Sequence, residues 1–113
     1  MPLVAFKEIF YGTIGSGASE DIKYQSDGDY IIKHILIIDK DDLSLSKLRV
    51  TVSLEQTALT KDTVPATVFG RNIRDAWTID WAITKGQVLK MTIKNEDSTD
   101  RTISVVLALY TLS

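Results

Sequence analysis

The fold class is decided by residues 85–112, which read KGQVLKMTIKNEDSTDRTISVVLALYTL. Apolar and polar side chains alternate along residues 87–94 and, after a polar loop, along residues 101–111. The apolar members are Leu89, Met91 and Ile93 in the first segment and Ile103, Val105, Leu107 and Leu109 in the second. Two segments of period two around a short polar connection are typical of a β-hairpin with one buried and one wet face. We therefore expect a closing hairpin that forms half of a sandwich core and packs against residues 77–83 or 30–38.

Strand character recurs through the rest of the chain. The segments rich in β-branched and aromatic residues are 3–11, 22–25, 30–38, 47–55, 64–69 and 73–84. Residues 30–38 are apolar on both faces, which indicates a central strand, whereas Pro65 suits a sheet edge. With the closing pair, the tally is about seven or eight strands separated by polar turns. We predict an all-β, antiparallel, jelly-roll-like sandwich, and both a jelly roll and an immunoglobulin-like strand order stay open.

Length and charge limit the domain count and the partners. A chain of 113 residues fits one domain, residues 1–113. It carries 13 Lys and Arg against 15 Asp and Glu, for a net charge of −2, and the basic residues are spread along the sequence. Nucleic-acid binding needs a concentrated basic field, so nucleic acid is not expected as a partner.

Targeting and redox features are few. Residues 1–9 lack a basic region ahead of an apolar run, and no later apolar stretch approaches the roughly 20 residues that cross a bilayer. The sequence contains no cysteine, which removes disulfides, thiolate catalysis and Cys-ligated zinc together. These features predict a protein made in the cytoplasm that has no membrane partner.

No group of residues in the sequence indicates a particular reaction. His34 lies in an apolar strand without a second His or Cys, so we expect a packed, hydrogen-bonded side chain and not a metal ligand. Most carboxylates fall in predicted turns, where they are solvated and lack the apolar pocket that acid catalysis needs. We expect no enzyme activity, no catalytic residue, no cofactor and no metal. Calcium at residues 27–29 or 39–42 stays open, although these loops lie at opposite ends of one strand and match no EF-hand spacing.

Aromatic side chains supply the candidate ligand-binding residues. Within residues 73–84, alternation puts Trp77, Ile79, Trp81 and Ile83 on one face. This spacing is typical of a core strand, and it also fits an exposed platform on which a sugar ring could stack. If the platform is exposed, the stacking residues are Trp77, Trp81 and Tyr110.

The order of features from Trp77 onward resembles the C-terminal half of small jelly-roll modules. These features are Trp77-Thr-Ile-Asp-Trp81, Lys85-Gly86, Val88-Leu-Lys-Met-Thr-Ile93, Asn95 and residues 103–110, roughly the C-terminal third of the chain. Similar arrangements occur in capsid-accessory, decoration and spike proteins of bacterial and archaeal viruses, and in carbohydrate-binding sandwiches. Such viral proteins carry no catalytic residues, so the resemblance transfers none to positions here.

The resemblance implies a non-enzymatic structural or assembly module, namely a decoration, cement or minor capsid protein of a virion that is made in the host cytoplasm. Outside a virion, the same features fit a cytoplasmic protein. Unpaired sandwich edges favour association, so we expect a homo-oligomer, a trimer or a pentamer, with or without capsid proteins as further partners. The alternative is a carbohydrate-binding module in which a glycan stacks on Trp77, Trp81 or Tyr110.

Overall fold

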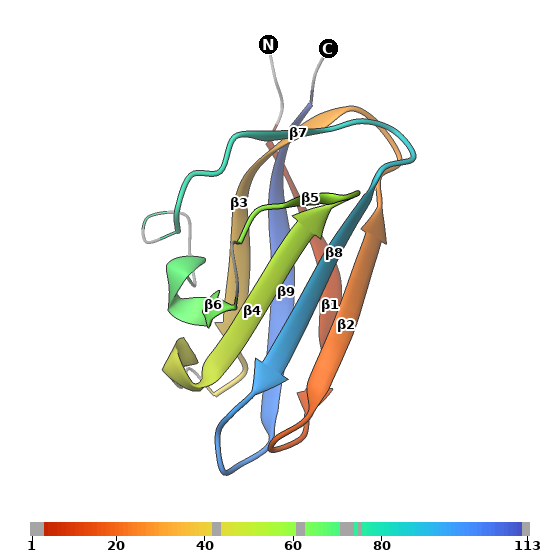
Figure 1. The fold of residues 1–113 in the computed structure, drawn as a ribbon. Coiled ribbons are helices and arrows are strands. Elements are labelled where there is room, and N and C mark those ends of the chain that lie inside the picture. The colour runs from red at the N-terminus through yellow and green to blue at the C-terminus, as the bar shows by residue number, and fades with distance from the viewer. Residues whose placement is uncertain (1–3, 42–43, 61–62, 71–73, 75, 112–113) are drawn as a thin grey trace.

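The chain folds into two antiparallel sheets that pack face to face (Figure 1). The structure is a computed structural model that describes residues 4–41, 44–60, 63–70, 74 and 76–111. The first sheet has the order β1 (Val4–Ile14), β9 (Arg101–Thr111), β3 (Tyr30–Asp39) and β7 (Trp81–Ile83). The second sheet has the order β2 (Ser19–Gln25), β8 (Val88–Asn95), β4 (Leu48–Leu54) and β5 (Thr57–Ala58), with β6 (Val64–Pro65) also paired to β4.

Helical structure is limited to two short pieces within the described residues. The 3-10 helix η1 (Leu45–Lys47) precedes β4, and the 3-10 helix η2 (Ala66–Val68) follows β6. In this described part of the chain, no helix has the length and apolar character needed to cross a bilayer.

The strand order is that of a jelly roll. β5 and β6 both pair with β4, through Ser53–Ala58 and Val50–Val64, so they act as one interrupted strand at the edge of the second sheet. From β1 to β4, and again from β6 to β9, each step along the chain crosses to the other sheet. In an immunoglobulin-like sandwich, sequence neighbours such as the first two strands share a sheet. The predicted all-β antiparallel sandwich is therefore confirmed, and the open strand order is resolved.

The expected closing hairpin is wrong, because β8 and β9 are not paired with each other. β8 pairs with β2 and β4, and β9 pairs with β1 and β3, so each is a central strand of a different sheet. The polar loop between them arches from one sheet to the other (Figure 1). Their inner faces consequently belong to opposite walls of the core and do not form one half of it. Alternation identifies the buried face of a strand, and it does not identify the neighbouring strand.

The core fills the space between the sheets from the alternating positions of the long strands. Its fully enclosed members, each 0% exposed, include Ile32, Ile37, Leu48, Val50, Val52, Leu89, Met91, Ile93, Ile103, Val105 and Leu107. Burying one such side chain contributes about 1.5–3 kcal/mol. β3 lies between β9 and β7 and is apolar on both faces, as expected of a central strand.

Two predicted strands are much shorter than expected. Of residues 64–69, only Val64–Pro65 is a strand, and it lies at the edge of β4 as the proline predicts. Of residues 73–84, only Trp81–Ile83 is a strand, while residues 76–80 are irregular. Asp80 has a φ of 54°, a left-handed conformation that interrupts a pleated strand. Residues 71–73 and 75 lie outside the described residues.

Candidate functional site

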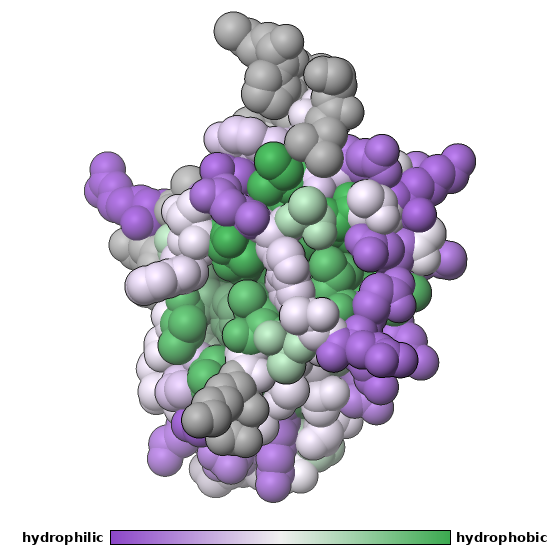
Figure 2. All heavy atoms as spheres, turned by 45° about the horizontal axis from the view of Figure 1, so that its top comes forward, coloured by the Kyte–Doolittle hydropathy of each residue, from purple (hydrophilic) through white to green (hydrophobic). Residues whose placement is uncertain are grey.

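A pocket of about 350 Å³ opens at the side of the sandwich that carries β5 and β6. Its walls come from the β5–β6 connection, from β6 and η2, and from the segment before β7. The lining residues are Leu59, Thr60, Val64, Val68, Phe69, Trp77 and Ile79. Figure 2 shows hydrophobic side chains gathered in the middle of the face that it presents, with hydrophilic side chains around them. Of these residues the sequence singles out only Trp77 as a candidate ligand contact, because alternation indicates which residues share a face and not which ones line a pocket between irregular segments.

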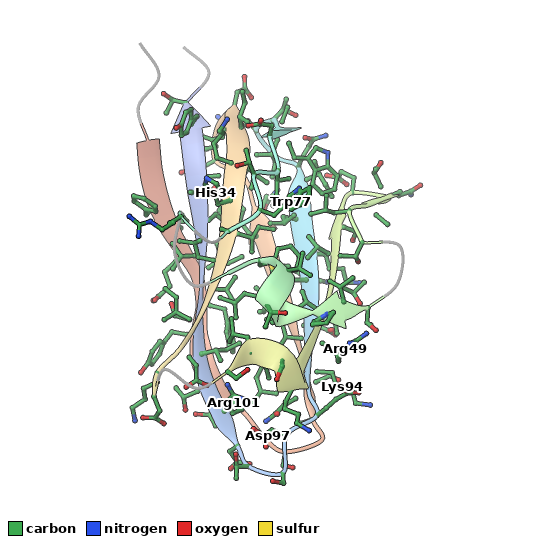
Figure 3. The ribbon with its side chains drawn as sticks, turned by 90° about the vertical axis from the view of Figure 1, so that its left-hand side faces the viewer. His34, Arg49, Trp77, Lys94, Asp97 and Arg101 are labelled. Carbon is green, nitrogen blue, oxygen red and sulfur yellow. The ribbon has the colours of Figure 1, made fainter. Side chains whose placement is uncertain are left out.

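Trp77 forms one wall of this pocket and is nevertheless 70% exposed. Its backbone is anchored to β3, where a bulge lies between Ile32 and His34. His34 Nδ1 lies 3.2 Å from the carbonyl oxygen of Trp77, and the Ile79 N–H donates to the Lys33 carbonyl at 2.8 Å. Figure 3 shows His34 and Trp77 close together beside β3. The exposed indole is therefore held by hydrogen bonds of its own segment to a central strand.

His34 has the packed, hydrogen-bonded role that the sequence predicts, with 9% of its surface exposed. It lies on the outer face of the first sheet and not in the core between the sheets, since it is paired with Ala108 and both stand outside the core cluster. Its role is to attach the Trp77 segment to the sheet.

The three predicted stacking residues do not form one platform. Trp81 is half-buried in β7 and packs against the core. Tyr110 is half-buried in β9, and the Lys33 ammonium lies 5.0 Å from its ring centroid while it also pairs with the Asp80 carboxylate. Trp77 alone of the three lines the pocket. The core-strand interpretation is wrong for Trp77, because the left-handed turn at Asp80 separates the two tryptophans.

The chemistry of the pocket favours an apolar or aromatic group. Among its described lining residues, Thr60 carries the one hydroxyl, and Thr60 Oγ1 already accepts from the Val52 N–H at 3.2 Å. Ligand pockets that select polar molecules place several polar groups around the apolar walls. This pocket instead offers an aromatic wall and aliphatic sides, a setting in which a ring or a branched side chain loses no hydrogen bond on entry.

The outer faces of the two sheets differ in polarity. The outward positions of the second sheet are mainly polar or charged, namely Asp21, Lys23, Gln25, Arg49, Thr51, Ser53, Lys90, Thr92 and Lys94. Those of the first sheet include the apolar residues Phe6, Tyr11, Ile38 and Val106 and the polar residues Glu8, Thr13, Thr102 and Ser104, while Leu36 and Ala108 on this face are already buried. Phe6, Tyr11 and Ile38 are 57%, 61% and 37% exposed. The outer face of the second sheet is mainly polar, whereas three large apolar side chains are exposed on the outer face of the first sheet.

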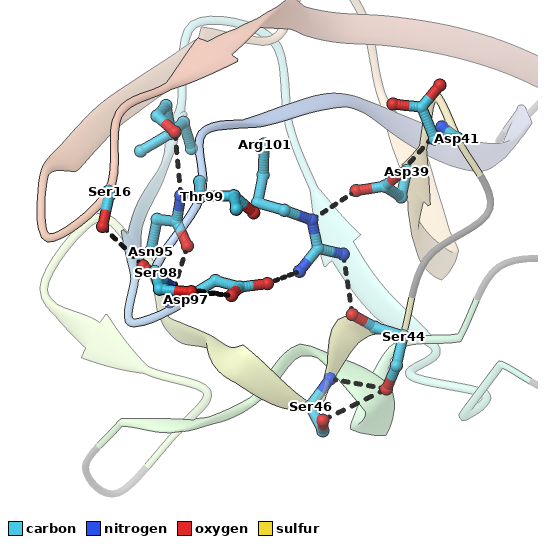
Figure 4. A network of polar contacts seen from close by, with 11 residues as sticks. Ser16, Asp39, Asp41, Ser44, Ser46, Asn95, Asp97, Ser98, Thr99 and Arg101 are labelled. Carbon is cyan, nitrogen blue, oxygen red and sulfur yellow. Dashed lines mark hydrogen bonds and ion pairs between the residues drawn. The ribbon is translucent and has the colours of Figure 1, made fainter.

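A buried polar network lies at the other end of the sandwich (Figure 4). Arg101 Nε donates to Asp39 Oδ2 at 2.6 Å, and its Nη1 donates to Asp97 Oδ2 at 3.1 Å. Its Nη2 donates to the Ser44 carbonyl at 2.7 Å. All three guanidinium nitrogens therefore have protein partners, and the network braces the loops at this end instead of forming an open site. The sequence held a signal for it, since Arg101 occupies the inner face two positions before Ile103.

The expectation that turn carboxylates are solvated is wrong for Asp39, which is 4% exposed because it pairs with Arg101. At the opposite end of β3, Asp27 accepts from the Tyr30 hydroxyl at 2.8 Å, and Asp29 accepts from the Lys85 N–H at 2.9 Å. The bond to Asp27 raises the pKa of Tyr30. Across the residues that the structure describes, no group of three or more His, Cys, Asp or Glu side chains could hold a metal ion, and Asp42 lies outside them.

No protein-family model matches the sequence, and no curated protein matches it at a significant level.

Proposed function

We propose that this chain is a non-enzymatic structural module that works as a homo-oligomer on a virion, as a decoration, cement or minor capsid protein. The observation that carries the proposal is the exposure of Phe6, Tyr11 and Ile38 on the outer face of the sheet β1-β9-β3, opposite a mainly polar outer face on the other sheet. Exposed apolar patches on soluble domains mark contacts with other proteins. A module built for assembly needs one such face, while the other can remain in water.

Three hydroxyl groups within this face are already hydrogen-bonded, which favours their burial. Ser104 Oγ donates to Glu8 Oε2 at 2.5 Å, and the hydroxyls of Thr13 and Thr102 lie 2.7 Å apart. Leaving a buried polar group without a partner costs about 1–3 kcal/mol. Because the hydroxyls of Ser104, Thr13 and Thr102 already have partners, a neighbouring subunit can cover these three side chains without that cost.

The virion part of the proposal draws on the jelly-roll order together with the resemblance in the C-terminal third. Jelly rolls build viral capsids, and they also build lectins and cupins, so the fold alone does not choose among these roles. Coat, portal or terminase genes next to the gene for this chain would support the virion assignment. A neighbourhood of metabolic genes would count against it.

Size-exclusion chromatography with light scattering tests the assembly role. The wild type should elute at a multiple of the monomer mass. Tyr11→Lys, which puts a charge among the exposed apolar side chains, should yield monomers, whereas Thr51→Lys on the polar face of the other sheet should keep the wild-type mass. A wild type that stays monomeric at micromolar concentration overturns the proposal.

Carbohydrate binding is the second candidate, and the 70% exposure of Trp77 beside the pocket is the observation that favours it. An exposed, backbone-anchored indole can stack on a sugar ring. Titration of tryptophan fluorescence against a panel of neutral and acidic sugars tests it. A response that Trp77→Ala abolishes and Trp81→Phe preserves would support glycan binding. Unchanged emission across the panel excludes the sugars tested at this residue.

A further inference from the structure

We infer that neighbouring copies associate head to tail, with Phe6 of one copy entering the Trp77 pocket of the next, and that repetition of this contact closes a ring. The inference rests on the assembly role proposed above, and it names the two surfaces that meet. It follows from the positions of Phe6 and the pocket, from their sizes and from their heights along the strands.

The protruding residue and the pocket lie on opposite sides of the same molecule. Phe6 is on β1, which ends one side of the first sheet and, within the described residues, pairs with β9 alone. The pocket lies on the other side, where β5 and β6 form the edge of the second sheet and the segment that contains Trp77 lies beside β3. Two different, complementary surfaces of one chain make a heterologous interface, which generates rings or filaments.

The pocket can hold the ring of Phe6. An apolar cavity of about 150 Å³ accepts benzene, and the pocket here has about 350 Å³. Phe6 is 57% exposed, so more than half of its surface is available to a partner. Val68 and Trp77 at the pocket are 45% and 70% exposed, so both partners gain by the contact.

Phe6 and Trp77 lie at the same height along the strands. The register of the first sheet puts Phe6 opposite Ala108, and Ala108 opposite His34. His34 in turn lies 3.2 Å from the Trp77 carbonyl. A rotation about an axis parallel to the strands therefore brings Phe6 of one copy to Trp77 of the next without a shift along that axis. A contact without a shift closes into a ring when the rotation between copies is an integral fraction of a turn, whereas a shifted one extends into a filament.

A second pair, Tyr11 and Val68 of η2, lies at a common level further along the strands. Tyr11, which is 61% exposed, shares a row with Ser104 and Ile38. The neighbouring Ile37 N–H donates to the Gly70 carbonyl at 3.0 Å, which places the end of η2 beside this row. Val68 belongs to η2. Tyr11 of one copy is thus level with the η2 wall of the next copy's pocket.

The aromatic area is in proportion to a stable interface. Phe6, Tyr11 and Trp77 are 57%, 61% and 70% exposed, and at roughly 200 Å² for each side chain they present about 400 Å². A standard interface buries roughly 1,600 Å² in total, of which a little over half is non-polar. These three residues would supply nearly half of that non-polar area, which is enough to form the hydrophobic centre of an interface.

Two variants, mixed and unmixed, test the inference. Phe6→Ser removes the protruding ring and leaves the pocket intact, while Val68→Asp puts a charge into the pocket and leaves Phe6 intact. Both positions are exposed, and circular dichroism with thermal melting checks that both variants fold. Lys23→Ala, on the edge strand β2 of the other sheet, is the matched control. Light scattering after size-exclusion chromatography gives the mass of each sample.

The wild type and Lys23→Ala should form rings of three or more copies, and each of the two other variants alone should be monomeric. Their equimolar mixture should form a one-to-one dimer and nothing larger, because one intact contact remains per pair. A wild-type dimer, variants that keep the wild-type mass, or a mixture that stays monomeric overturns the head-to-tail contact while the assembly role stands. A monomeric wild type overturns both.

Discussion

Arg101 and Asp39 form an ion pair inside the sandwich, with Nε and Oδ2 2.6 Å apart and the two side chains 1% and 2% exposed. The pair joins β9 to β3 where the loops of this end begin. Through Asp97, the same guanidinium also holds the arch between β8 and β9. Because β8 and β9 share no ladder of hydrogen bonds, this polar contact performs the positioning that cross-strand bonds perform in a hairpin.

Asp39→Ala should destabilise the protein strongly. The substitution leaves the Arg101 guanidinium without one of its carboxylates in a place that water barely reaches, and breaking a buried pair in this way costs about 3–5 kcal/mol. Urea unfolding, followed by tryptophan fluorescence, should show a much lower midpoint. Glu96→Ala, at an exposed position of the nearby arch, should change the free energy of unfolding by less than about 0.5 kcal/mol. Equal midpoints for the two variants contradict a stabilising role for the pair.

Asn95→Ala should destabilise the same end of the molecule by about 1–3 kcal/mol. The Asn95 side chain is 0% exposed, its Nδ2 donates to the carbonyls of Ile14 and Thr99 at 2.9 Å each, and its Oδ1 accepts from the Asp97 N–H at 2.9 Å. Removing the Asn95 side chain leaves these backbone groups without their hydrogen-bond partner and weakens the contact between β1 and the arch. Hydrogen exchange should be faster at Asp97 while it is unchanged in β4. Unaltered exchange at Asp97 contradicts this assignment.

Much of the fold could be predicted from the sequence because alternation identifies buried faces. Alternation correctly predicts the apolar inner residues of β8 and β9, and the apolar run at residues 30–38 indicates a central strand. The pairing could not be predicted in the same way. A strand of period two fits any partner that shares its core, so residues 85–112 fitted a hairpin as well as an arch between two sheets. The charged Arg101 on the inner face was the one local sign that this arch needs a polar anchor.

The candidate site was harder to predict, since it depends on irregular backbone. Residues 77–83 alternate as a strand does, and only the left-handed φ of 54° at Asp80 separates Trp77 from Trp81. An aspartate adopts a left-handed conformation more readily than most residues do. The presence of an aspartate in the sequence is nevertheless not enough to predict that conformation. The anchoring of Trp77 to His34 joins residues 43 positions apart, a contact that no local pattern encodes.

High pH should destabilise the end of the sandwich around Tyr30. Burial is the first cause that raises the pKa of Tyr24, and the hydrogen bond to Asp27 is the first cause for Tyr30. A raised pKa favours the neutral phenol in the folded state. Its contribution to stability is therefore complete below the ordinary tyrosine pKa of about 10 and is lost as the pH rises through the folded-state value.

Absorbance of the phenolate, followed against pH, measures this shift. The folded protein should titrate later than the same chain unfolded in urea, and Tyr30→Phe should reduce the difference by removing one late group. A folded chain that titrates no later than the unfolded one contradicts the raised pKa values.

Replacement of the two tryptophans by alanine should lower the free energy of unfolding by different amounts. Trp77→Ala in a monomeric Phe6→Ser background should cost less than about 1 kcal/mol, because the side chain is mostly exposed. Trp81→Ala in that background should cost about 1.5–3 kcal/mol, because it removes a ring that packs against the core.

The sequence contains two tryptophans, so Trp81→Phe leaves Trp77 as the sole emitter. In the assembled Trp81→Phe protein its emission should be blue-shifted and shielded from iodide, and the added substitution Phe6→Ser should shift it to the red and expose it. Emission that is the same in both states contradicts a contact between Phe6 and the Trp77 pocket.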